Sequence, residues 1–153
     1  MFLAGTPPTA TAQQKGVYVR QGRARFYVKA KVRRAERTWF SRLYPYRRAL
    51  AQPLDGPVLV SIRLVFPFTA DTSKKTRLAG RNIPHGRRPD IDNLVKALLD
   101  TMTKMRFWHD DGQIFALCVA KYRGAKVGTT IHVQTLAELT HMRMEDLIEA
   151  EVL

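Results

Sequence analysis

The chain has 153 residues, which favours a single domain, and it contains no apolar run of the ~18 residues that a membrane span needs. Lys and Arg total 26 against 13 Asp and Glu, so the formal net charge is +13. Residues 1–90 carry a net +15 and residues 91–153 a net −2. Such a surplus favours nucleic acid as partner, because neutralised phosphates release counterions. A membrane surface would instead require a basic helix with a clean apolar face.

The amino-terminal segment lacks the charged and apolar regions of a signal peptide. The single cysteine, Cys118, lies in an apolar run, so we expect a small buried side chain rather than a nucleophile. Both observations predict a cytoplasmic protein with no membrane partner.

The first half of the chain is predicted to hold short strands and one basic helix. We expect a strand at residues 1–4 and a strand-like piece at 17–20 within an extended loop. An apolar stripe at spacings of three and four predicts a helix between residues 26 and 50, which Pro45 kinks or ends. The members of this stripe are Val32, Ala35, Trp39 and Leu43. Alternating apolar residues predict a strand at 58–66.

Residues 69–88 are polar and show no apolar period. This composition predicts a loop that becomes ordered on a phosphate backbone. The basic residues of this loop that we expect to contact DNA are Lys74, Lys75, Arg77, Arg81, Arg87 and Arg88.

The second half is predicted to begin with an amphipathic helix at 92–104, with Asp90 as its N-cap. The apolar face of this helix consists of Leu94, Leu98, Met102 and Met105. Two strands, 113–123 and 127–134, are expected to form a hairpin at Gly124. A final helix at 136–153 is expected to pack either on its own body or on a second subunit. The domain proper would then span residues 1–135, with 136–153 as its extension.

Several carboxylates stand out in this basic chain. Asp90 and Asp92 lie at the start of the predicted helix, and Asp110 and Asp111 lie at the start of the following strand. We expect a return strand to bring Asp111 back near Asp90. Convergent carboxylates repel one another unless a cation lies between them, and Mg²⁺ prefers oxygen ligands. Such a site on a DNA-binding surface predicts phosphodiester hydrolysis by a metal-activated water.

Lys96 lies on the same helical face as Asp92, so it either pairs with Asp92 or points at the scissile phosphate. Simpler interpretations remain open for the acids. Asp90 is more often only a helix cap, and Asp110-Asp111-Gly112 is more often only a turn. The combination with Lys96 in a chain of net charge +13 favours a functional site.

The segment RPDIDNLVKALLD at residues 88–100, followed by FWHDDGQI at 107–114, resembles the signature of the RusA family of Holliday junction resolvases. The pattern is D-x-D-N-L-x-x-K-x-x-x-D, then a short turn, an aromatic pair and D-D-x-Q-I. The match has no gaps and the same spacing at every acid. The strand at 58–66 and the Pro7-Pro8 loop resemble the family more loosely.

This resemblance implies a Mg²⁺-dependent endonuclease, with Mn²⁺ as an acceptable substitute and no organic cofactor. Family members act as homodimers and place symmetric nicks in DNA four-way junctions during recombination and repair. The resemblance assigns the catalytic, metal-binding acids to Asp90, Asp92 and Asp111, and the catalytic lysine to Lys96. It gives supporting roles to Asp110, as an additional acid, and to Asn93, through hydrogen bonds at the helix start.

Two positions depart from the family pattern. His109 replaces an aliphatic residue, and Met105-Arg106 stands where a glycine is expected to end the helix.

The expected fold is a small α/β domain with a mixed sheet of about four strands and packed helices, paired as a homodimer because symmetric nicks need two sites. Two other classes of function remain open. They are a non-catalytic nucleic-acid-binding protein and a metal-dependent nuclease for other branched or single-stranded DNA.

Overall fold

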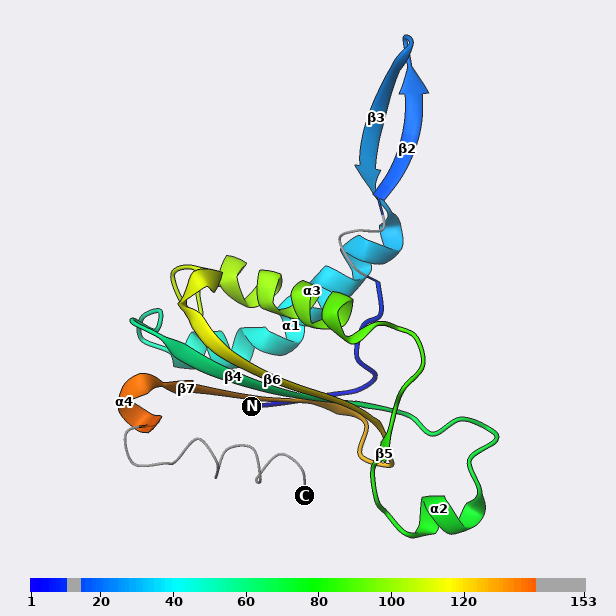
Figure 1. Cartoon of the computed structure of the whole chain (residues 1–153). Helices are drawn as coiled ribbons and strands as arrows, with labels where there is room; N and C mark the ends of the chain where they lie inside the picture. Colours follow the sequence, from blue (N-terminus) through cyan, green and yellow to red (C-terminus); the bar gives the residue numbers. More distant parts are fainter. Residues whose placement is uncertain (11–14, 140–153) are drawn as a thin grey trace.

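The computed structural model describes residues 1–10 and 15–139 of the chain. Two long helices, α1 (Ala30–Ala49) and α3 (Ile91–Lys104), pack on one face of a five-stranded mixed sheet (Figure 1). The sheet order is β1 (Phe2–Ala4), β7 (Gly128–Thr135), β4 (Val58–Phe66), β6 (Ile114–Arg123) and β5 (Ile83–Pro84). A separate hairpin consists of β2 (Lys15–Arg20) and β3 (Arg23–Val28). The short helices are α2 (Lys74–Leu78), η1 (Asp111–Gln113) and α4 (Leu136–Leu139).

Strand β4 lies at the centre of the sheet because it is apolar on both faces. Every residue of β4 except Arg63 is buried. It pairs in parallel with β6 on one side and antiparallel with β7 on the other. The predicted hairpin between these last two strands is therefore wrong. A direct pairing of β6 with β7 would leave β4 at an edge, with one row of its backbone N–H and C=O groups unpaired.

Helix α1 buries the predicted stripe, since Val32, Ala35, Trp39 and Leu43 are all among the core residues. Pro45 does not end this helix, which continues to Ala49. Tertiary contacts hold its last turn. The Tyr46 hydroxyl donates to the Phe2 carbonyl at 2.8 Å, and Arg47 Nε donates to the Met105 carbonyl at 2.8 Å. These bonds and the buried stripe offset the missing proline N–H.

The hairpin β2–β3 replaces the predicted start of this helix. The expected strand-like piece at 17–20 forms part of β2, whereas β3 replaces the end of the predicted loop and the start of the predicted helical segment at residue 26. Gln21 and Gly22 both have positive φ, 52° and 71°. Two successive residues of this kind form the two-residue turn that matches the twist of paired strands.

The predicted loop at 69–88 is mostly irregular but contains α2 and β5. Arg77 organises it by donating from its guanidinium to the carbonyl oxygens of Thr69, Ala70 and Thr72. Beyond the loop, the predicted final helix is described only as α4, and residues 140–153 lie outside the described part. No helix of the described residues is long and apolar enough to cross a membrane.

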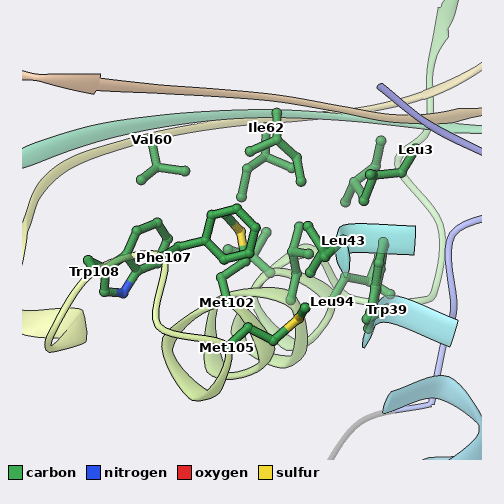
Figure 2. Close-up of a cluster of buried hydrophobic side chains, with 14 of the residues drawn as sticks. Leu3, Trp39, Leu43, Val60, Ile62, Leu94, Met102, Met105, Phe107 and Trp108 are labelled. Atoms are coloured by element: carbon green, nitrogen blue, oxygen red, sulfur yellow. The ribbon is translucent and has the colours of Figure 1, made fainter. Parts of the chain in front are cut away.

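The core lies between β4 and the two helices (Figure 2). Val60 and Ile62 project from β4 toward Leu43 of α1 and Met102 of α3. The predicted apolar face of α3 is confirmed, because its four members are at most 7% exposed. Trp108 closes one end of the core, and its Nε1 donates to Thr103 Oγ1 at 2.8 Å. This packing fixes how α3 lies on the sheet.

Helix α3 ends at the position where a glycine was expected. Arg106 has a φ of 62°, in the left-handed region, and its N–H donates to the Thr103 carbonyl at 2.9 Å. A side chain with a Cβ is disfavoured in this conformation, whereas glycine adopts it freely.

We expect Arg106→Gly to raise the free energy of unfolding by up to about 1 kcal/mol, because it removes left-handed strain. Arg106→Ala is the matched control, since it removes the same charge and keeps the Cβ. Chemical denaturation of the three proteins checks this prediction. Equal stability of the glycine and alanine variants would contradict it.

Candidate functional site

The amino-terminal end of α3 presents two carboxylates. Asp90 occupies the N-cap position, as predicted, but its side chain makes no capping hydrogen bond. Asp92 lies in the first turn, and both residues are exposed. Within the described residues, neither carboxylate has a hydrogen bond or ion pair. The positive end of the helix dipole stabilises both charges. These two groups are therefore available to a ligand.

The chain just before Asp90 is anchored to β6. Lys121 Nζ donates to the carbonyl oxygens of Arg87 and Pro89, at 2.7 and 2.5 Å. The backbone N–H of His85 donates to the Lys121 carbonyl at 2.9 Å. These bonds fix the backbone that leads into the two acids. The sequence pattern gave no signal for Lys121, because the role depends on a strand pairing that was not foreseen.

His85 is a buried side chain beside this anchor. Burial lowers the pKa of its imidazole below the ordinary value, and Arg123, Lys121 and Arg87 lower this pKa further. The ring packs edge-on against Phe66, and its Nε2 accepts from Arg123 Nη2 at 3.3 Å. A cavity beside His85 is lined by the hydroxyl side chains of Thr69, Thr72, Ser73 and Thr76, by Arg87 and Arg123, and also by Asp71, Ile83 and Pro84.

The second group of acids lies at η1, where the two neighbours differ in role. The Asp110 carboxylate accepts from the Gly112 N–H at 2.8 Å and forms a capping box with Gln113. Gln113 Nε2 also donates to the carbonyl oxygens of Leu54 and Gly56. Asp110 is thus part of the turn, whereas the Asp111 side chain is exposed and its carboxylate has no hydrogen bond or ion pair among the described residues. This difference favours Asp111 as the ligand-binding acid.

The family departure at His109 has a structural explanation. His109 Nε2 lies 2.8 Å from Asp55 Oδ1, and the His109 backbone N–H donates to Gln113 Oε1 at 2.7 Å. The first contact ties the turn to the segment that precedes β4, and the second holds the turn together locally. The substitution therefore adds a contact on the surface of the turn and leaves Asp111 exposed.

One chain does not bring the two groups of acids together. Helix α3 has 14 residues, a length of about 20 Å, and η1 follows its far end (Figure 1). Strand β6 begins only after Asp111 and then runs back to Lys121, which contacts Pro89. The return strand therefore leads away from Asp111, contrary to the expectation that it would carry this acid back to Asp90. Among residues 1–10 and 15–139, no group of three or more His, Cys, Asp and Glu residues is placed to hold a metal ion.

The structure departs from one of the two alternatives expected for Lys96 and from the hydrogen bonds expected for Asn93. Lys96 Nζ lies 3.4 Å from Asp100 Oδ1 rather than pairing with Asp92, and its side chain is 61% exposed. Asn93 was expected to form hydrogen bonds at the helix start, but its Oδ1 is buried and has no partner in the described structure. Two unpaired carboxylates and an unpaired amide oxygen are the donor types that Mg²⁺ prefers. The residues present at the start of α3 thus fit a hard cation.

The basic residues of the 69–88 loop are exposed, as expected for DNA contacts. Arg77 is engaged with backbone carbonyls of its own loop. Arg87 and Arg88 directly precede the anchored Pro89, so they lie beside the acids of α3. Their positive charge offsets the repulsion that these acids would exert on a phosphate.

Comparisons with known proteins identify the family of this chain. The family model described as endodeoxyribonuclease RusA matches residues 6–134. A protein of Lactococcus phage r1t named crossover junction endodeoxyribonuclease is 31% identical over 116 residues, which are 76% of this chain and 82% of the relative. A relative with the same name from Enterobacteria phage 82 is 37% identical over 83 residues, 54% of this chain and 62% of that protein.

The similarity to the Escherichia coli K12 protein of the same name is more local. It is 45% identical over 47 residues, which cover 31% of this chain and 39% of the relative. The matched segments thus span less than two thirds of the Escherichia coli and phage 82 relatives. The family model, in contrast, covers most of the chain. This chain belongs to the RusA family of endodeoxyribonucleases.

Proposed function

We propose that this protein is a Mg²⁺-dependent endonuclease that resolves DNA four-way junctions by paired, symmetric phosphodiester hydrolysis. It would act on recombining DNA in the cytoplasm, with residues 1–135 as the nuclease domain and 136–153 as its extension. The observation that carries the proposal is the state of Asp90, Asp92 and Asp111. These three acids match the family signature, and their carboxylates make no hydrogen bond or ion pair within the described chain, although the protein carries a net charge of +13.

Each residue has a role that follows from its position. Asp90 and Asp92 would hold the cation at the start of α3, and Lys121 keeps the backbone before them in place. When bound, Mg²⁺, or Mn²⁺ in its place, supplies charge stabilisation to the transition state and acidifies water. Lys96 can leave its exposed contact with Asp100 at little cost, because surface ion pairs are weak. Its ammonium group can then bind the scissile phosphate.

We propose that Asp111 completes the site of a second copy of the chain. Asp90 and Asp111 lie at opposite ends of the unit that α3 forms with β6. A two-fold axis across the middle of this unit would exchange its ends and place Asp111 of each copy beside the paired acids of the other. Phe115 and Leu117 on β6 are 47% and 45% exposed. Strand β5 pairs with β6 only at residues 122 and 123, so the rest of this edge is open among the described strands.

We expect Asp92→Asn to lower the rate of junction cutting by at least about 100-fold, because the cation site loses a charged ligand. Junction binding should persist or tighten, since the variant removes a charge that repels phosphate. Asp71→Asn is the control, because Asp71 is an exposed acid outside the family signature. Gel assays of binding in EDTA and of cutting in Mg²⁺ measure the two effects. Cutting at the wild-type rate by Asp92→Asn would refute the site assignment.

A cleavage panel tests the substrate class. Four-way junctions, forks, single strands and linear duplex of shared sequence are each incubated with and without Mg²⁺. We expect paired nicks in the junction, only with Mg²⁺, and much slower cutting of the others. A junction cut no faster than duplex would contradict the proposal. Binding without any cutting would indicate a non-catalytic DNA-binding protein, and preferred cutting of forks or single strands would indicate a different nuclease.

A further inference from the structure

The β2–β3 hairpin has two chemically different faces. Its six residue pairs run in register from Lys15↔Val28 to Arg20↔Arg23. Neighbouring residues of a strand point to opposite faces, and directly paired residues share a face. One face therefore carries Tyr18, Arg20, Arg23, Arg25 and Tyr27. The opposite face carries Val17, Val19, Ala24, Phe26 and Val28.

The apolar face is not part of the protein core. The hairpin forms a sheet of its own and projects from the start of α1, away from the five-stranded sheet (Figure 1). Val19 and Phe26 are 71% and 70% exposed. Valine and phenylalanine side chains gathered on one exposed surface indicate a contact with a partner.

The opposite face suits nucleic acid. Arg20, Arg23 and Arg25 make no ion pair within the described residues, and β2 and β3 contain no acidic residue. Guanidinium groups bind phosphate oxygens in a fork geometry. The Tyr18 and Tyr27 rings lie together, with centroids 6.1 Å apart. Arginine interleaved with exposed tyrosine favours DNA over an acidic peptide, because bases stack on aromatic rings.

The base of the hairpin lies beside the helix that carries the candidate site. Val28 lines a cavity together with Ala97 and Asp100 of α3. Ala97 directly follows Lys96. From this base the hairpin extends over about 20 Å, given six residues at ~3.3 Å each. DNA held at the α3 site is thus within reach of both hairpin faces.

We propose that the β2–β3 hairpin recognises the branch point of the DNA junction. This inference rests on the proposed junction-cutting function. The Arg-Tyr face binds the phosphates of the exchanging strands, and the apolar face packs against bases whose stacking is interrupted at the branch. Continuous duplex offers no exposed base faces to Val19 and Phe26, whereas insertion of apolar side chains at an opened step is a known mode of DNA contact. The apolar face would therefore confer preference for junctions, and the arginines would confer affinity for any DNA.

The apolar face is tested with the double variant Val19→Ser/Phe26→Ser. We expect its affinity for a four-way junction in EDTA to fall about tenfold, while its affinity for linear duplex of shared sequence changes less than twofold. Val19→Leu/Phe26→Leu is the matched control and should keep the junction preference. 2-Aminopurine at the branch point should lose its unstacking signal only with the serine variant. Equal losses on both DNAs, or no loss on either, would overturn the proposal.

The arginine face is tested with Arg20→Gln/Arg23→Gln/Arg25→Gln. Affinity should fall on both DNAs, and the slope of log Kd against log salt should drop by about 2 to 3, one counterion per lost contact. Arg48→Gln, exposed at the far end of α1, is the control. An unchanged salt slope would contradict the role of this face.

Two further measurements separate other causes of failure. Circular dichroism melts should be unchanged, because the hairpin lies outside the core. Sedimentation equilibrium of the serine variant should match that of wild type. A shift toward monomers would show that a second copy, rather than DNA, covers the apolar face. If the wild-type protein fails to cut junctions but these preferences hold, only the proposed function fails.

Discussion

The packing of α3 against the sheet is the constraint on which the candidate site depends. Strand β4 is buried on both faces, so β6 and β7 must lie on its two sides. Strand β6 then runs back along α3 from η1 to the anchored Pro89. This arrangement separates Asp111 from Asp90 by the length of the helix. The same arrangement fixes the paired acids firmly, because Lys121 on β6 holds the carbonyl oxygen that precedes them.

The separation of the acids links the chemistry to symmetry. Paired nicks in a four-way junction require two active sites related by a two-fold axis. If each site needs acids from both copies, a monomer carries no complete site and cannot cut DNA. The lone chain would then be inactive while it searches along duplex. The β2–β3 hairpin fits the same account, because its apolar face would contact bases that only a branched substrate exposes.

Much of the local structure could be predicted from the sequence. The apolar alternation of β4 and the apolar faces of α1 and α3 identified the core, and the acid spacing identified the family. The pairing of strands could not be predicted, because β6 and β7 are close in sequence and a hairpin is the simpler connection. Strand β3 could not be predicted, because it spans the end of the predicted loop and the start of the basic segment that continues into the helix. Pro45 does not end α1, because distant bonds from Tyr46 and Arg47 outweigh the loss of its own N–H donor.

A subunit-mixing assay tests the shared site most directly. Asp92→Asn and Asp111→Asn proteins, each inactive alone, are mixed and allowed to exchange subunits. If Asp111 acts across the interface, each mixed dimer has one intact site, so about a quarter of all sites work and cuts appear as single nicks. A mixture of Asp90→Asn with Asp92→Asn is the control, and it should stay inactive because no site is intact. Failure of the first mixture to cut, with mixed dimers demonstrated, would contradict a site built from two chains.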